Sequence, residues 1–168
     1  MGYMASGKSI VGRQLAKKLA YNFMDLDHFI EDTEGMPISE LFAKKGEIHF
    51  RKKETESLHK IFNNYNKLVL SLGGGTPCYG NNLELIKSNT KVTTIYLKAT
   101  IATIMNRVRN ETNTRPLISH LTNEDDLAEF IGKHLFERSQ FYSQADHIIN
   151  TDQLNVDQIV EQIVLKLY

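Results

Sequence analysis

Gly2-Tyr3-Met4-Ala5-Ser6-Gly7-Lys8-Ser9 begins this chain almost at its first residue and matches the pattern G-x-x-x-x-G-K-[ST] of a phosphate-binding loop. The glycines of such a loop let the backbone curl until successive N–H groups point at phosphate oxygens, and the following helix adds the positive end of its dipole. Lys8 is expected to reach the β- and γ-phosphates, and the Ser9 hydroxyl to bind Mg²⁺. The residues of this stretch that we expect to bind nucleotide are Gly2, Met4, Ala5, Ser6, Gly7, Lys8, Ser9 and Ile10.

The position of the loop is as informative as its sequence. A phosphate-binding loop normally follows a buried strand, but only Met1 precedes Gly2 here. We therefore expect either that an upstream strand is missing from this sequence or that the loop is poorly supported.

The composition is that of an ordinary soluble domain. A chain of 168 residues with 41% hydrophobic and 24% charged residues fits a single domain, 1–168, with a substantial core. Twenty basic residues balance twenty acidic ones, so no net charge favours nucleic acid or an anionic membrane. Neither an apolar run of about 18 residues nor a signal peptide is present, and a lone cysteine, Cys78, fits a reducing compartment. We expect a cytoplasmic protein, monomeric, with small-molecule partners.

Short apolar runs alternate with helical patterns along the chain, which predicts a parallel sheet covered by helices on both faces, an α/β fold. The expected strands are 22–25, 68–72, 92–97 and 145–150, and the expected helices include 7–20, a long stretch from 37, 100–109, 122–141 and 156–167. Thr122-Asn123-Glu124-Asp125 resembles a capping box. The polar segment at about 110–122 contains Arg115-Pro116 and is expected to be a mobile lid, with Arg115 covering the phosphates.

Two carboxylates, Asp25 and Asp27, lie at the end of the strand expected at 22–25. Ligand groups gather at the carboxyl ends of strands in an open α/β sheet, and the spacing of two places both carboxylates on one side. One could hold Mg²⁺ through water, and the other could accept a proton or hydrogen bond from a substrate hydroxyl. The alternative is that Asp27 merely caps the next helix.

Other candidate residues carry weaker signals. Gly73-Gly74-Gly75 after a buried strand indicates close approach of the backbone to a ligand, although a flexible exit from the strand is an alternative. Arg51 lies among charged neighbours, and this charged pattern alone favours a helix face exposed to solvent. Arg138 carries no local signal. The six histidines show no metal-binding spacing, and Cys78 is expected to be a packed thiol.

Taken in this order, the candidate residues resemble shikimate kinase, a small P-loop kinase related to the nucleoside monophosphate kinases. The resemblance covers essentially the whole chain. It rests on the phosphate loop, Asp25-Leu26-Asp27, Gly46-Glu47, Phe50-Arg51 with Glu54, Gly73-Gly74-Gly75, Arg115-Pro116-Leu117, and Glu137-Arg138 with Tyr142.

The resemblance implies a three-layer P-loop kinase fold with a parallel sheet of order 2-3-1-4-5, whose central strand 1 is missing or truncated in this chain. Loss of that strand is expected to cost many kcal/mol, against a total stability of about 5–15 kcal/mol for a typical domain.

The resemblance also implies an activity, the ATP-dependent phosphorylation of the 3-hydroxyl of shikimate on the way to chorismate and aromatic amino acids. Lys8 and Ser9 would serve ATP and Mg²⁺, and Asp25 would belong to the water-mediated shell of the metal. Asp27 would orient the attacking hydroxyl. Further roles would fall to Arg51, Arg138 and the Gly73–Gly75 backbone at the substrate carboxylate, to Arg115 at the transferring phosphoryl group, and to Arg107 or, equally near the family position, Arg109 at the adenine.

Two alternatives remain at this point. The chain could be a kinase for another small hydroxy acid such as gluconate. It could also be a truncated, non-catalytic nucleotide-binding module.

Overall fold

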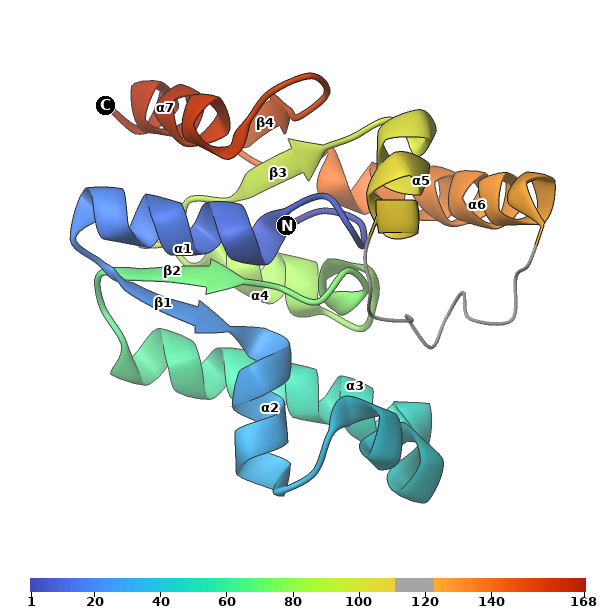
Figure 1. Cartoon of the computed structure of the whole chain (residues 1–168). Helices are drawn as coiled ribbons and strands as arrows, with labels where there is room; N and C mark the ends of the chain where they lie inside the picture. The colour runs from blue at the N-terminus through green and yellow to red at the C-terminus, as the bar shows by residue number, and fades with distance from the viewer. Residues whose placement is uncertain (111–122) are drawn as a thin grey trace.

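A computed structural model describes residues 1–110 and 123–168 (Figure 1). Arg115 and the expected lid therefore lie outside the described residues. In chain order the elements are α1 (Lys8–Leu19), β1 (Asn22–Asp25), α2 (Leu26–Glu34), α3 (Ile38–Asn64), β2 (Leu68–Ser71), the 3₁₀ turn η1 (Thr76–Cys78), α4 (Asn82–Ser88), β3 (Ile95–Lys98), α5 (Ile101–Asn110), α6 (Glu124–Tyr142), β4 (His147–Asn150) and α7 (Val156–Leu167). Strands thus alternate with helices, and the predicted α/β class is confirmed.

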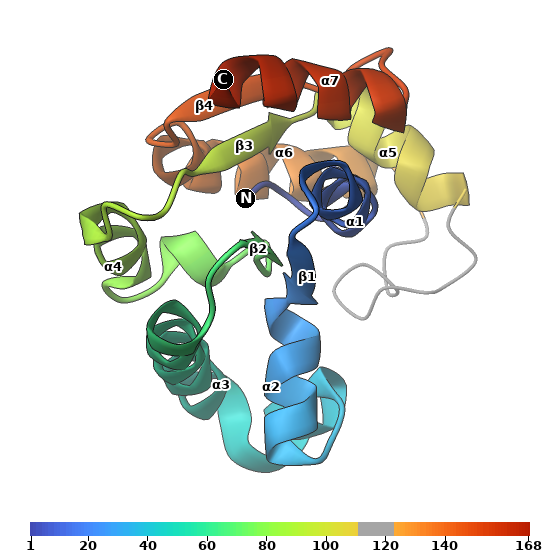
Figure 2. The ribbon, with the colours of Figure 1, turned by 90° about the vertical axis from the view of Figure 1, so that its left-hand side faces the viewer.

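The strands form two parallel pairs rather than one continuous sheet. β1 pairs with β2, with Asn22 opposite Leu68, and β3 pairs with β4, with Ile95 opposite His147. Figure 2 shows the pairs side by side, with the N-terminus between β2 and β3. The order β1-β2-gap-β3-β4 matches the order 2-3-1-4-5 with its central strand absent, as the sequence predicts.

Three apolar clusters hold the layers together. Helices α1 and α7 cover one face of both strand pairs through residues such as Val11, Leu15 and Ile163. On the other face, α2, α3 and α4 pack on β1 and β2 around Leu58 and Ile61. Helices α5 and α6 pack against β3 and the phosphate loop in the third cluster. Because strands alternate their faces, neighbouring residues of β3 contribute to different clusters.

The gap between β2 and β3 is a structural feature in its own right. The backbone of Met1 enters it: the Met1 α-amino group donates to Ile95 O at 2.6 Å, and Leu97 N–H donates to Met1 O at 2.9 Å. Cavities of about 350 Å³ and 290 Å³ adjoin this position, and both are lined by Met1, Leu68, Leu70 and Ile95. Burial lowers the pKa of the Met1 α-amino group to about 5.

The structure corrects several details of the expected elements. β3 begins at Ile95, not at 92, and Thr94 just before it donates its N–H and hydroxyl to Asp146. Asn123 is the N-cap of α6 and accepts from Asp125 N–H at 2.8 Å, whereas Thr122 of the expected capping box lies outside the described residues. The long helix α3 is kinked at Gly46, where φ is 80° and ψ is 170°. Residues 38–45 and 47–64 are therefore two helical halves with different directions.

Candidate active site

Most of the predicted site residues line one cleft of about 950 Å³ at the carboxyl ends of the strands. The phosphate loop forms one wall, and the beginning of α2, both halves of α3, the loop after β2 and the segment from residue 154 into α7 form the others. The predicted site residues that line the cleft are Met4, Ala5, Ser6, Gly7, Lys8, Ser9, Ile10, Asp25, Asp27, Arg51, Gly73, Gly74, Gly75, Arg107 and Arg138.

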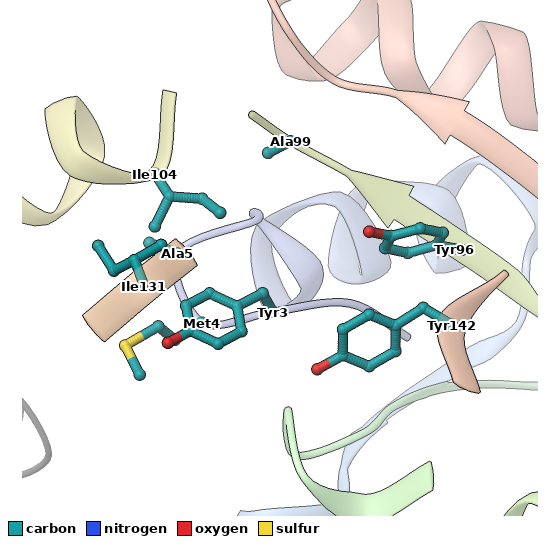
Figure 3. Packing of buried hydrophobic residues seen from close by; sticks show 8 residues of the cluster. All are labelled: Tyr3, Met4, Ala5, Tyr96, Ala99, Ile104, Ile131 and Tyr142. Carbon is teal, nitrogen blue, oxygen red and sulfur yellow. The ribbon is translucent and has the colours of Figure 1, made fainter. Parts of the chain in front are cut away.

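Apolar side chains anchor the phosphate loop from one side. Tyr3, Met4 and Ala5 are buried against Ile104 and Ile131 of helices α5 and α6, as Figure 3 shows. The loop is therefore supported on this side, although the strand that would precede it is absent.

The backbone of the loop is curled as the motif predicts. Gly7 has a φ of 90°, and Ala5 adopts a φ of 56° in the left-handed region. For alanine this conformation costs about 1 kcal/mol. Lys8 Nζ folds back and donates to Tyr3 O at 2.8 Å, so its charge lies over the curled backbone.

Ser9 and Asp25 lie together where the first turn of α1 meets the end of β1. Ser9 Oγ donates to Asp25 Oδ2 at 2.8 Å, and Asp25 Oδ1 accepts from Asp27 N–H at 3.1 Å. Asp25, rather than Asp27, is thus the N-cap of α2, which rules out the capping role considered for Asp27. A hydroxyl and a carboxylate so placed are oxygen ligands that suit Mg²⁺ shared with phosphates.

Asp27 is held in the cleft with little solvation. Its Oδ1 is buried and has no hydrogen-bond partner among the described residues. Burial, reinforced by the carboxylates of Asp25 and Glu54 and opposed by Lys8, raises the pKa of Asp27 to about 6. A carboxylate with an orphaned oxygen and a raised pKa is suited to accept a hydrogen bond or a proton from a hydroxyl.

The raised pKa of Asp27 makes stability depend on pH. Because the folded-state pKa lies above the unfolded value of about 3.9, its contribution is fully present below pH 4 and is lost as pH rises through 6. We expect Asp27→Asn to gain about 2 kcal/mol of unfolding free energy over the wild type between pH 4 and pH 7.5. Urea unfolding at several pH values measures this difference.

Asp32→Asn is the matched control, since Asp32 is an exposed carboxylate on the same helix. It should leave the pH dependence of unfolding unchanged. A difference between Asp27→Asn and wild type that stays constant across this range would contradict the burial of a charged Asp27.

Arg51 is fixed from three directions. Its Nη1 donates to Glu54 Oε2 at 2.8 Å, its Nη2 donates to Glu47 Oε1 at 3.0 Å, and its guanidinium lies 3.7 Å from the centroid of the Tyr79 ring. The Glu54 side chain is only 1% exposed, and its Oε1 accepts from Thr76 Oγ1 at 2.5 Å. The solvated-face interpretation of Arg51 is therefore wrong, because this arginine is held by a buried carboxylate.

The three glycines after β2 leave room for Asp27 on one side of the loop and Arg51 on the other. A Cβ atom on Gly73 would lie 2.9 Å from Asp27 Oδ1, and one on Gly75 would lie 3.0 Å from Arg51 Nη1. Any side chain here would displace one of these functional groups. The chain's own site residues thus lie close to this backbone, and the approach of a ligand to it stays a prediction.

Arg138 reaches the same loop from α6. A Cβ on Gly74 would lie 3.7 Å from Arg138 Nη1, and the guanidinium is 5.7 Å from the centroid of the Tyr3 ring. One turn later on α6, the buried Tyr142 hydroxyl donates to Gly74 O at 2.5 Å. Helix α6 therefore both supplies a cation to the cleft and holds the glycine loop in place.

Of the two arginines near the end of α5, only Arg107 faces the cleft. Its Nη1 donates to Ala5 O at 3.2 Å and its Nη2 to Thr151 O at 3.2 Å, which joins the phosphate loop to the segment after β4. Arg109 instead forms an ion pair with Glu124 at 2.5 Å. The geometry thus favours Arg107 for a role at the nucleotide.

Comparison with known proteins identifies the family of this chain. A family model described as shikimate kinase matches residues 4–168. The chain belongs to the shikimate kinase family. The shikimate kinase of Flavobacterium psychrophilum is 44% identical over 163 residues, which are 97% of this chain and 94% of that protein.

Solved structures of the family superpose over nearly the full chain. Shikimate kinase from Bacteroides thetaiotaomicron has a TM-score of 0.92 at 33% identity, covering 99% of this chain and 95% of that one. Shikimate kinase from Acinetobacter baumannii in complex with shikimate has a TM-score of 0.85 at 32% identity, covering 99% and 89% of the two chains. The protein is therefore a kinase of the P-loop fold.

Sequence reasoning missed the supporting residues of this shikimate kinase family site. Thr76, Tyr79 and the role of Glu54 depend on burial, which the charged pattern of α3 conceals. The spacing of three between Arg51 and Glu54 is the one signal that could have indicated their ion pair.

Three further features concern Cys78, groups of metal-binding side chains and the apolar character of the helices. Burial raises the pKa of Cys78 to about 11, which agrees with a packed and unreactive thiol. Within residues 1–110 and 123–168, no three His, Cys, Asp or Glu side chains are grouped to hold a metal ion by themselves. In the same described ranges, no helix has the length and apolar character needed to cross a membrane.

Proposed function

We propose that this protein transfers the γ-phosphoryl group of ATP to the 3-hydroxyl of shikimate, giving shikimate 3-phosphate and ADP. The observation that carries the proposal is the convergence of a phosphate loop, one orphaned carboxylate and two guanidinium groups on a single cleft. Together with family membership, this set matches a small anionic polyol and a nucleotide, because each end of such a substrate finds a complementary group.

The carboxylate of shikimate is assigned to Arg51 and Arg138, with the backbone of Gly73–Gly75 beside them. Charge-assisted bonds from guanidinium to carboxylate are strong and directional. Arg51 is already oriented by Glu47 and Glu54, so little conformational entropy is lost when the substrate binds.

Asp27 is assigned to the hydroxyl end of the substrate. Its unpartnered Oδ1 accepts a hydrogen bond from the attacking hydroxyl and takes up its proton as the phosphoryl group moves. The pKa of about 6 lets Asp27 be ionised at neutral pH and still function as a base.

ATP is assigned to the phosphate loop, with Lys8 at its phosphates and Arg107 at the adenine side. Ser9 and Asp25 fit Mg²⁺, which neutralises phosphate charge when bound. Arg115 remains a proposed cation for the transferring phosphoryl group. The protein is proposed to act as a cytoplasmic monomer on small molecules, without nucleic acid or membrane partners, in keeping with its balanced charge.

The test is direct. Protein mixed with ATP, Mg²⁺ and shikimate should release ADP, and omission of shikimate should abolish the release. Gluconate in place of shikimate should give at most a few per cent of the rate. Equal turnover of gluconate would favour a kinase for another hydroxy acid, and no shikimate-dependent ADP would favour a non-catalytic module.

Arg51→Ala tests the carboxylate clamp. Removal of a charge-assisted, oriented contact is expected to cost about 2–4 kcal/mol, so KM for shikimate should rise about 30- to 1,000-fold. KM for ATP should change little, because Arg51 lies across the cleft from the loop. Steady-state kinetics with each substrate varied in turn measure both values.

The control for Arg51→Ala is Lys52→Ala. Lys52 is the next residue of the helix, its side chain is 75% exposed, and its nearest acid is Glu56 at 3.9 Å. This variant should behave as the wild type. Unchanged shikimate affinity and turnover in Arg51→Ala would contradict the assignment of Arg51 to the carboxylate.

A further inference from the structure

One carboxylate outside the cleft gathers two lysines and a histidine. Glu34 lies at the end of α2, and its side chain is only 8% exposed. It pairs with Lys45 Nζ at 2.8 Å, His49 Nε2 at 3.2 Å and Lys53 Nζ at 3.3 Å, all of them on α3. These hydrogen bonds, that of Lys45 foremost, lower the pKa of Glu34 to about 2. Glu34 is therefore an anion throughout the range in which the protein would work.

These three partners of Glu34 come from both sides of the kink in α3. Lys45 ends the first half, whereas His49 and Lys53 belong to the second half, beyond Gly46. The space beside Gly46 is open, because a Cβ atom there would meet no atom within 4 Å. Apolar packing also joins the halves: the rings of Phe42 and Phe50, one from each half, have centroids 4.8 Å apart and belong to a cluster that includes Ile30 of α2. Glu34 adds a polar tie to this packing, because it pairs with side chains of both halves.

The geometry of the second half connects this tie to the cleft. His49 and Lys53 are four residues apart and so share one face of the helix, the face turned to Glu34. Arg51 lies midway between them, about 200° around the helix axis from each, on the face that contacts the glycine loop. A contact that holds the back of this helix therefore directs Arg51 toward the cleft.

Asp27, on the side of the cleft opposite Arg51, belongs to the same helix as Glu34. Asp27 lies in the first turn of α2, and Glu34 is the last residue of that helix. The distance between Asp27 and Arg51 thus depends on how α3 packs on α2. A second polar contact supports this packing, since Glu31 Oε1 of α2 accepts from Ile38 N–H at 2.9 Å at the start of α3.

We propose that Glu34 is a positioning residue for shikimate recognition, which ties both halves of α3 across Gly46 and thereby sets the place of Arg51 relative to Asp27. This inference rests on the proposed function, because it assigns the substrate to that pair. Glu34 contacts no reacting atom, and its effect passes through α3. The partners of Glu34 are 26–39% exposed, and ion pairs with partners so exposed contribute little to stability by themselves, so the effect is expected in binding rather than in folding.

The experiment replaces Glu34 by Gln, which keeps the size of the side chain and removes its charge. KM for shikimate should rise about five- to tenfold, while kcat and KM for ATP stay within about twofold of the wild type. Glu40→Gln is the matched control, because its ion pair with Lys44 lies entirely within the first half of α3. This control should leave all three kinetic values unchanged.

Variants of Lys45 separate a positioning role from a general loss of structure. Lys45→Gln cuts only the tie to the first half and should raise KM for shikimate about two- to fivefold, whereas Lys45→Arg keeps the charge and should restore it. If Glu34→Gln does not fold, the two Lys45 variants decide the question.

Two results would overturn the inference. One is a wild-type KM for shikimate in Glu34→Gln, or in Lys45→Gln should the former not fold. The other is an equal loss in kcat and in KM for ATP. A wild-type protein without shikimate-dependent ADP release would instead refute the proposed function, and the inference with it.

Discussion

An apolar strand fused ahead of Met1 should raise the free energy of unfolding of this protein by about 4 kcal/mol. The edges of β2 and β3 that face each other are unpaired along most of their length, and the cavities of about 350 Å³ and 290 Å³ adjoin the space between them. Each Val or Ile buried there gains about 1.5–3 kcal/mol, against about 1–2 kcal/mol for ordering its backbone. New ladder hydrogen bonds add to the net gain.

The extension also removes an unfavourable group. The α-amino group of Met1 is buried between Ile95 and its surroundings, and its pKa of about 5 means that folding favours its uncharged form at neutral pH. A peptide bond at this position restores a neutral N–H donor to Ile95 O. This part of the gain should therefore be absent above about pH 8, grow as pH falls between 8 and 5, and be complete below about pH 5.

A suitable extension has about six residues, mostly Val and Ile, because apolar helices cover both faces of the gap. Urea unfolding of the extended and original chains measures the effect, and an extension of equal length made of Gly and Ser is the control. Equal stability of the two extended chains would contradict the interpretation of the gap as a strand position. Better support of the phosphate loop should also raise the affinity for ATP.

Lys8→Ala should lower kcat at least 1,000-fold with any acceptor, the largest catalytic effect that we expect from a single substitution. Phosphoryl transfer depends on positioning and on neutralising the charge of the phosphates, and a lost cation at the transition state costs about 4 kcal/mol or more. Lys8 Nζ already lies over the loop through its bond to Tyr3 O at 2.8 Å. Unlike Arg51→Ala, this variant should fail equally at saturating shikimate.

The control for Lys8→Ala is Lys17→Ala, an exposed lysine on the same helix. It should keep the wild-type kcat, and circular dichroism should show that both variants fold. A Lys8→Ala protein with more than a tenth of the wild-type kcat would contradict the assignment of the loop as the ATP site.

Local patterns carried much of the fold and part of the site. The phosphate loop, the alternation of strands with helices and the pair Asp25 and Asp27 are visible because they depend on spacing along the chain. The phosphate loop without a strand ahead of it predicted a gap in the sheet, and the structure has one between β2 and β3. The motifs also sufficed for the family, since their order is more specific than any one of them.

Properties that depend on distant segments were out of reach. The charge pattern around Arg51 is that of a solvated helix, but Glu54 is buried there by Thr76 from a loop 22 residues away. The kink at Gly46 leaves the helical periodicity of α3 intact on both sides, so periodicity alone could not reveal it.

By itself, the sequence determined which chemical groups are present and which elements carry them, because spacing, periodicity and turn chemistry act between neighbours in the chain. Only the tertiary structure decided which groups face one another: Arg51 with the glycine loop, Asp27 with an unsatisfied oxygen, Arg107 rather than Arg109 at the phosphate loop. The physical reason is that burial and electrostatic pairing depend on distance in space, and the packing of helices on the two strand pairs sets that distance.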